Sequence, residues 1–206
     1  MRRWVAVAGI AGPVGFLTAA FLLAALRHDV IAAQGWASWP SSMALGGAPG
    51  IPMIAAFLWL AGCYTAFSLG ALRPGLGHPA AWIGVLAIAV GDVLLAFPTD
   101  GPDTPATWHG ALHLAGVLIV TVATLVAAAG VSIATRGRRS WRPWRLTLPV
   151  PFLAAAIGAV AGTDTGWAKV VYVVGITLPA AVVGRLLLSA ATAGRRDRRI
   201  SGARSG

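Results

Sequence analysis

Residues 108–134 read WHGALHLAGVLIVTVATLVAAAGVSIA, and beyond His113 this stretch has no charged or titratable side chain. A helix needs about 20 predominantly apolar residues to cross about 30 Å of hydrocarbon. Five further apolar runs, each bounded by Arg, Pro or Gly, lie at 4–26, 51–72, 79–97, 146–162 and 167–193. The sequence therefore predicts an all-α fold, a polytopic transmembrane bundle of six helices.

The composition points the same way. Of the 206 residues, 57% are hydrophobic and 11% charged, and the mean hydropathy is +0.77. A soluble domain carries about 25% charged residues. A soluble globule, a disordered chain and a disulfide-stapled domain are therefore excluded, the last because Cys63 is the single cysteine. The chain has no Glu and no Asn, and its abundant Arg, Ala and Gly fit a GC-rich bacterial genome.

The basic residues predict the orientation. All of the 16 except Arg27 and Lys169 lie on one side of the predicted bundle or at its edge. By the positive-inside rule, both termini then lie in the cytoplasm, with the helices in the bacterial cytoplasmic membrane. We expect a six-helix transmembrane domain over 1–194 and a basic cytoplasmic tail over 195–206. The basic excess thus sets topology, and no nucleic-acid partner is expected.

The acidic residues gather on the other, outer side. Those placed there are Asp29, Asp92, Asp100, Asp103 and Asp164, which leaves only Asp197 inside. The positive-inside rule acts on Lys and Arg and hardly on Asp, so it does not explain this asymmetry. The outer side is therefore expected to carry the chemistry.

Asp92 lies six residues before Pro98, about 9 Å below the outer end of its helix. His113 lies at a similar depth on the next helix, and His109 is one turn above it on the same face. The connection between the two helices is short, so Asp92 and His113 are expected to meet. Together with Asp100 in that connection, these residues are the candidate catalytic group.

Two other readings of these residues stay open. A carboxyl at that depth is costly unless it is neutral or partnered, so Asp92 and His113 either serve a function or form a structural hydrogen bond. His109 and His113 also have the i,i+4 spacing of zinc ligands, with Asp92 or Asp100 as a third, but the Glu of the H-E-x-x-H pattern is missing. No bound metal is expected. Asp103 or Thr104 is expected to cap the helix that follows.

Nine Trp residues are many for this length. Trp59 is predicted about 12 Å deep, too deep for an interfacial belt. The outer aromatic residues predict a substrate pocket, the alternative being ordinary belt and core packing. The candidate substrate-binding residues are Trp36, Trp39, Trp59, Trp108, Asp164, Trp167 and Tyr172.

Several short motifs resemble those of a large family of six-span bacterial membrane proteins, known as a domain of unknown function. They are GIAGP (9–13), WPSSMALG (39–46) and FPTD (97–100), followed by His109 and His113. The resemblance covers most of the chain, and the FPTD-then-His spacing is its most specific part. It implies the six-span topology and a polar signature of Asp100, His109 and His113, and it implies no activity.

At the level of chemistry, the chain is similar to small integral membrane terpene cyclases in its size, Trp richness and isolated membrane acids. This resemblance implies an enzyme that cyclises or isomerises a prenylated, lipid-like substrate by protonation from an outer-layer Asp. A buried carboxyl stays protonated and ready to donate, and aromatic faces stabilise a carbocation. Such chemistry needs no cofactor.

Two alternatives remain at this stage: a non-catalytic protein that binds lipid or a partner, and a metal-assisted lipid hydrolase using His109, His113 and an Asp. The expected partners are a lipid-like or prenylated small molecule and the membrane lipids. The sequence does not indicate an oligomeric state.

Overall fold

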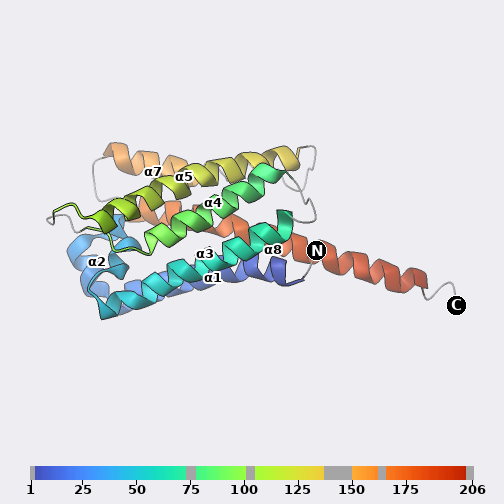
Figure 1. The fold of residues 1–206 in the computed structure, drawn as a ribbon, viewed down its shortest axis with the longest axis horizontal. Helices are drawn as coiled ribbons and strands as arrows, with labels where there is room; N and C mark the ends of the chain where they lie inside the picture. Colours follow the sequence, from blue (N-terminus) through green and yellow to red (C-terminus); the bar gives the residue numbers. More distant parts are fainter. Residues whose placement is uncertain (1–2, 73–77, 101–104, 137–149, 162–165, 203–206) are drawn as a thin grey trace.

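The computed structural model describes residues 3–72, 78–100, 105–136, 150–161 and 166–202. Side chains are described throughout these ranges except at 37, 155–156, 158–161 and 186–202. The described residues form helices and connecting segments without a strand, so the predicted all-α class is confirmed. The long helices pack side by side in one elongated bundle (Figure 1).

Each of the six predicted apolar runs overlaps a helix, the shortest of which has 12 residues. These helices are α1 (Arg3–Leu26), α3 (Ile51–Leu72), α4 (Pro79–Leu95), α5 (Trp108–Ala134), α7 (Val150–Ala161) and α8 (Gly166–Gly202). α8 runs past the predicted end at 193, so the predicted tail begins as a continuation of that helix.

Four segments of the described chain are long and apolar enough to cross a membrane: Arg3–Leu26, Ala48–Leu72, Trp108–Ala134 and Gly166–Arg185. α4 is equally apolar but has 17 residues. These helices support a membrane protein.

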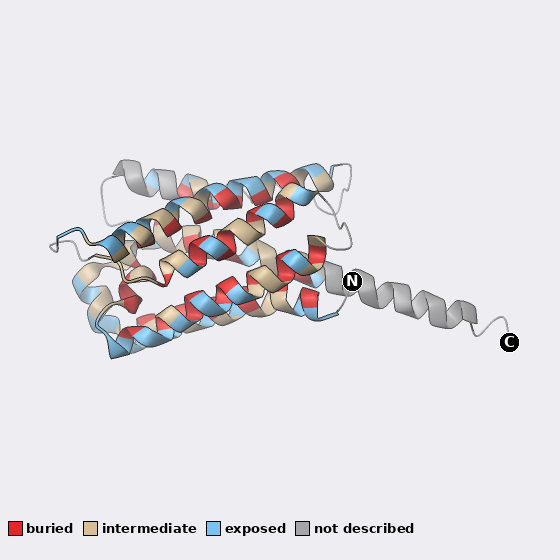
Figure 2. Cartoon of the chain, viewed as in Figure 1, coloured by how far each residue is buried: buried red, intermediate tan, exposed pale blue. Residues whose placement is uncertain are grey.

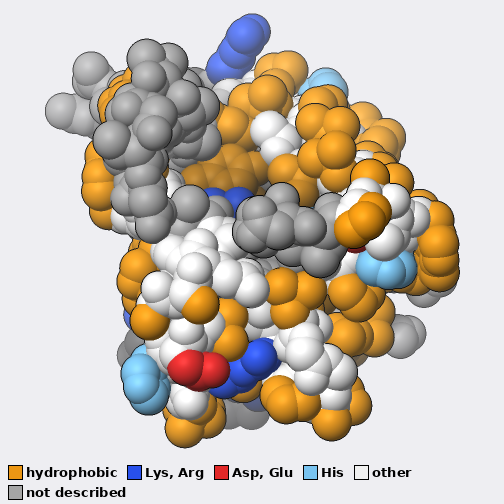
Figure 3. Space-filling model, turned by 90° about the vertical axis from the view of Figure 1, so that its left-hand side faces the viewer, with side chains coloured by type: hydrophobic (Ala, Val, Ile, Leu, Met, Phe, Trp, Pro, Cys, Tyr) orange, Lys and Arg blue, Asp and Glu red, His pale blue; other side chains and the backbone are white. Residues whose placement is uncertain are grey.

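The helices pack mainly against their neighbours along the chain. α1 packs against α3 and α8, α3 against α4, α4 against α5, and α7 against α8. α1 begins, and α8 leaves the bundle, at one end (Figure 1). The opposite end carries the short helix α2 (His28–Gln34) and the connection between α4 and α5, and we call it the α2 end. Viewed from that side, hydrophobic side chains share the described surface with other side chains and backbone, and a few charged and histidine side chains lie among them (Figure 3).

The segment between α1 and α3, which lies between two of the predicted apolar runs, is a folded cap. It contains α2 and three short 3₁₀ turns, η1 (Trp36–Ser38), η2 (Ser41–Ala44) and η3 (Ala48–Gly50). The Arg27 guanidinium donates hydrogen bonds to the carbonyls of Met43 and Leu45 at 2.9 and 3.0 Å. Trp39 is fully buried, and its Nε1–H donates to the Ala20 carbonyl of α1 at 3.2 Å. These bonds fix the cap on the bundle and hold Ser41 in place.

α4 and α5 approach closely because glycines face each other between them. A Cβ on Gly84 would lie 2.6 Å from the Ala127 nitrogen, and one on Gly116 would lie 2.8 Å from the Gly91 carbonyl oxygen. Both distances are shorter than any normal contact, so only glycine fits at these two positions. Small residues of this kind let transmembrane helices pack backbone to backbone.

Large apolar side chains lie on the outside of the bundle, and exposed and buried residues alternate along the helices wherever side chains are described (Figure 2). Leu22, Leu58, Leu118 and Val122 are all about half exposed or more. A monomeric soluble protein rarely exposes so much contiguous apolar surface. Hydrocarbon tails of lipids are the surroundings that such a surface fits.

Candidate functional site

Asp92 is buried inside the bundle near the α2 end of α4, with 3% of its surface exposed. One carboxyl oxygen, Oδ2, is buried and has no hydrogen-bond partner. An unpaired buried charge costs several kcal/mol in such surroundings, which favours the neutral form of the carboxyl. Buried polar groups are nearly always hydrogen-bonded, and an exception calls for an explanation.

The Asp92 side chain lines a small cavity of about 60 Å³ between α1, α3, α4, α5 and α8. The rings of Phe16, Phe57, Tyr64 and Tyr172 form much of its wall. The Tyr64 hydroxyl donates to the Thr177 carbonyl at 3.2 Å. The Tyr172 hydroxyl lies 2.6 Å from Thr121 Oγ1, which itself donates to the Val117 carbonyl, so Tyr172 is the donor of that bond. Both hydroxyl protons are engaged, which leaves Asp92 as the free acid on this wall.

A second, larger cavity of about 490 Å³ lies beyond the first. Its walls are almost wholly apolar and come from α3, α4, α5, α7 and α8. Tyr64, Ile88 and Ile176 line both cavities and form a partition between them. The pair of cavities thus offers an apolar chamber next to a small chamber with titratable groups.

Lys169 of α8 also lines the small cavity, and the sequence analysis did not include it among the site residues. Its Nζ lies 5.9 Å from the centroid of the Tyr172 ring, a cation–π distance. Asp92 and Lys169 form no ion pair within 4 Å, since the one ion pair among described residues is between His109 and Asp100. The small cavity is therefore lined by a carboxyl and an amine that form no ion pair with each other.

The predicted pairing of Asp92 with His113 is wrong. His113 is buried at 4% exposure, and its Nδ1 lies 2.7 Å from the Phe97 carbonyl oxygen. Its Nε2 lies 2.9 Å from Ser41 Oγ of the cap. Both ring nitrogens are thus occupied by other partners. The rotation of each helix about its own axis turns the two side chains to different neighbours.

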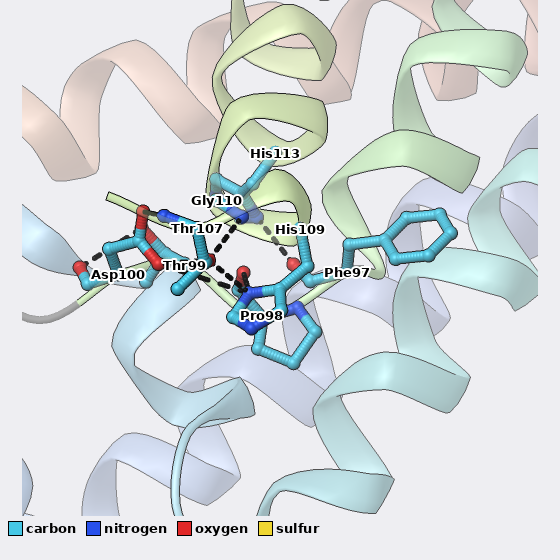
Figure 4. Close-up of polar contacts among 8 residues, drawn as sticks. All are labelled: Phe97, Pro98, Thr99, Asp100, Thr107, His109, Gly110 and His113. Carbon is cyan, nitrogen blue, oxygen red and sulfur yellow. Dashed lines mark hydrogen bonds and ion pairs between the residues drawn. The ribbon is translucent and has the colours of Figure 1, made fainter. Parts of the chain in front are cut away.

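Asp100 and His109 meet instead at the start of α5 (Figure 4). Asp100 Oδ2 accepts the Thr107 N–H at 3.0 Å, and Oδ1 accepts the Thr107 hydroxyl at 2.5 Å. Thr107 Oγ1 in turn accepts the Gly110 N–H, which makes Thr107 the N-cap of α5. His109 Nδ1 lies 2.9 Å from Thr107 Oγ1 and 3.2 Å from the Pro98 carbonyl oxygen.

This arrangement gives Asp100 and His109 a structural role at the helix start. The hydrogen bonds from the Thr107 hydroxyl and amide hold the pKa of Asp100 below its usual value. A Cβ on Gly110 would overlap the Asp100 carboxylate, so a glycine opens the space for it. The expected caps Asp103 and Thr104 lie outside the described residues, and the observed N-cap is Thr107.

No group of three or more His, Cys, Asp or Glu side chains in the described part of the chain is placed to hold a metal ion. His109 and His113 bond to different neighbours, as described above, and Asp92 bonds to neither.

The two cavities described above are not lined by the Trp residues of the predicted pocket. Trp59, Trp108 and Trp167 are more than half exposed on the outside of the bundle, and Trp36 and Trp39 pack against each other in the cap. The Trp59 Nε1–H donates to the Ala11 carbonyl of α1, which satisfies it on the lipid-facing surface. Of the seven candidate substrate-binding residues, Tyr172 lines the small cavity, none of the five Trp lines either cavity, and Asp164 lies outside the described residues.

Comparisons with models of protein families, with curated proteins and with solved structures give no match for this chain. The class that the fold and the cavities define, a helical membrane protein with a titratable internal cavity, rests on the chain itself.

Proposed function

We propose that all six long helices span the bacterial cytoplasmic membrane, with the α2 end outside and both termini in the cytoplasm. The distribution of basic residues supports this orientation. So does the arrangement of the helices, because α1 begins and α8 leaves the bundle at the same end. On this topology, the small cavity lies in the outer half of the membrane.

The proposed activity is the cyclisation or isomerisation of a prenylated, lipid-like substrate by protonation from Asp92. The observation that carries this proposal is the unpartnered carboxyl oxygen of Asp92 in an aromatic-walled cavity. A neutral carboxylic acid is a proton donor, and it needs no metal or cofactor to act on an alkene. Surrounding rings stabilise the cation that results.

In this reaction, Asp92 both donates the first proton and accepts the last one. Asp92 transfers its proton to one alkene carbon, and a carbocation forms on the neighbouring carbon. Loss of a proton from an adjacent carbon to the Asp92 carboxylate gives the rearranged product and restores the acid. The apolar walls of the cavity keep water from capturing the cation.

The two cavities suit an amphiphilic substrate in one orientation. The larger, apolar cavity would hold the hydrocarbon chain, since burying apolar surface is favourable at about 25 cal/mol per Å². Lys169 would face a polar or anionic end of the substrate in the small cavity. Asp100 and His109 would act from outside the cavity by holding the start of α5.

The test is an assay of the purified chain in D₂O with farnesylated and geranylgeranylated small molecules, followed by chromatography and mass spectrometry. The expected product has the composition of the substrate and carries a solvent deuteron. Asp92→Asn should abolish it, whereas the matched control Asp29→Asn, which changes an exposed carboxyl at the α2 end, should not. A deuterated product formed equally fast by Asp92→Asn would rule the proposal out.

Lipid binding without chemistry is the second candidate, and the 490 Å³ apolar cavity favours it. If the protein only binds lipid, a lipid should co-purify with the chain and the D₂O assay should give no product. Ala180 lines only the larger cavity. Ala180→Trp should fill part of that cavity and release the lipid.

A further inference from the structure

Ser41 and His113 form a hydrogen-bonded pair of the kind that activates a serine for nucleophilic attack. Ser41 Oγ lies 2.9 Å from His113 Nε2, although the two residues are 72 positions apart. We propose that this pair is an acyl-transfer site, with Ser41 as the nucleophile and His113 as its general base, and that its substrate is an ester of a long-chain lipid. This activity is separate from the proton transfer assigned to Asp92.

The hydrogen bonds determine the form of the imidazole. The Phe97 carbonyl oxygen can only accept, so His113 Nδ1 carries the proton in their 2.7 Å bond. In the neutral ring, Nε2 is then the acceptor, and the Ser41 hydroxyl must be the donor to it. The hydroxyl proton therefore already points at the base that would remove it.

The Phe97 carbonyl supplies the third member of the arrangement. A base acts efficiently when its other nitrogen is held by an acceptor that fixes the ring and its tautomer. Here the Phe97 carbonyl oxygen, just beyond the end of α4, has that position in place of a carboxylate (Figure 4). A backbone acceptor carries no charge, so it suits a site inside the membrane.

Ser41 lies where a lipid ester could reach it. It is partly exposed at the start of η2 and lines the small cavity, as does Lys169. The acyl chain of an ester bound there has the larger apolar cavity beyond the partition. Lys169 is the cation on the same cavity wall that is available to a developing oxyanion.

The reaction balances with water as the co-reactant. Ser41 Oγ attacks the carbonyl carbon and passes its proton to His113 Nε2. The bond from that carbon to the alcohol oxygen breaks, the alcohol leaves with the proton, and an acyl-serine remains. Water then attacks the acyl-serine, its proton passes through Nε2 to Ser41 Oγ, and a carboxylic acid is released.

The experiment uses a long-chain alkyl fluorophosphonate as the probe, on the full chain in detergent and in lipid vesicles. Ser41 Oγ would form a bond to phosphorus as fluoride leaves and the proton passes to His113. Peptide mass spectrometry is expected to place the adduct on Ser41. A wild-type chain that carries no adduct on Ser41 after prolonged incubation overturns the proposal without any variant.

Two variants test whether labelling of Ser41 depends on His113 or only on the accessibility of the serine. Ser42→Ala is the matched control, because Ser42 is the neighbouring serine but is fully buried and its Oγ has no partner. In this variant, the probe should label Ser41 at the wild-type rate. His113→Gln should slow labelling of Ser41 roughly 100-fold or more, the usual contribution of a general base. Rates are compared on the monodisperse fraction of each variant, and equal labelling of Ser41 in His113→Gln would contradict the assignment.

Discussion

The Asp100 carboxylate binds both polar groups of Thr107: Oδ2 accepts the amide proton at 3.0 Å and Oδ1 the hydroxyl proton at 2.5 Å. The Thr107 oxygen then accepts the Gly110 N–H at 3.1 Å. The carboxylate thereby orients the residue that caps α5. This relationship gives the first two predictions.

Thr107→Ala should lower the free energy of unfolding by about 1 kcal/mol, because the first turn of α5 loses its side-chain cap. Thr107→Ser keeps the hydroxyl and should retain most of the wild-type stability. Thermal unfolding in detergent measures both. If the two variants were equally destabilised, the lost methyl group rather than the cap would be responsible.

Acid should remove the contribution of Asp100 to stability. Its pKa is lower in the folded chain than in the unfolded chain, because Thr107 donates hydrogen bonds to the carboxylate. The stabilisation is therefore complete above the unfolded-state pKa of about 3.9 and is lost as the pH falls through the lower folded-state value. Wild type should melt at a higher temperature than Asp100→Asn at pH 7, and the two melting curves should converge in acid. A difference that grew on acidification would contradict this account.

Gly84→Ala should destabilise the bundle by about 1–3 kcal/mol, since the new methyl group would lie 2.6 Å from the Ala127 nitrogen and push α4 from α5. Gly62→Ala is the matched control, because a Cβ there meets nothing within 4 Å. Alanine also has the higher helix propensity, so Gly62→Ala should be neutral or slightly stabilising. Resistance to unfolding by detergent compares the two variants directly.

Asp92→Leu should raise the free energy of unfolding by about 1–3 kcal/mol, because it removes a buried polar group that lacks a partner. Ser68→Ala gives the contrast, since the Ser68 hydroxyl is buried but donates to the Trp82 carbonyl at 2.5 Å. That variant should lose about 1 kcal/mol. A loss of stability in Asp92→Leu would show that the carboxyl holds the fold together.

Arg27→Gln should loosen the cap, because one guanidinium nitrogen donates to the Met43 and Leu45 carbonyls together. Amide hydrogen exchange over residues 41–50 should become faster, while exchange in the middle of α3 should not change. Unchanged exchange over 41–50 would mean that packing of Trp39 alone holds the segment.

The helices were predictable because their apolar runs are long and sharply bounded. The Thr107 cap also had a signal that the sequence analysis did not use: a threonine directly before the first residue of an apolar helix. In its place, Asp103 and Thr104 were expected as caps because that connection is rich in Asp and Pro.

Contacts across the bundle were not predictable in the same way. Depth in the membrane follows from counting residues, and so Asp92 and His113 were placed at one level. The rotation of each helix about its axis depends on packing, such as that between Gly84 and Ala127, which one sequence does not reveal. Ser41 was missed because it lies between two predicted apolar runs, and the bonds of Arg27 and Trp39 that place the cap join residues far apart in the sequence.

The partition between the two cavities has a consequence for substrate selection. If a chain reacts at Asp92 while its tail lies in the larger cavity, the tail must pass Tyr64, Ile88 and Ile176. The partition then selects substrates by length. The number of carbons between the reacting double bond and the first bulky branch must match the distance from Asp92 to these three side chains. The preferred chain length of the substrate would be set by the partition. Replacing Ile88 or Ile176 by a smaller residue would change that length and leave Asp92 unaltered.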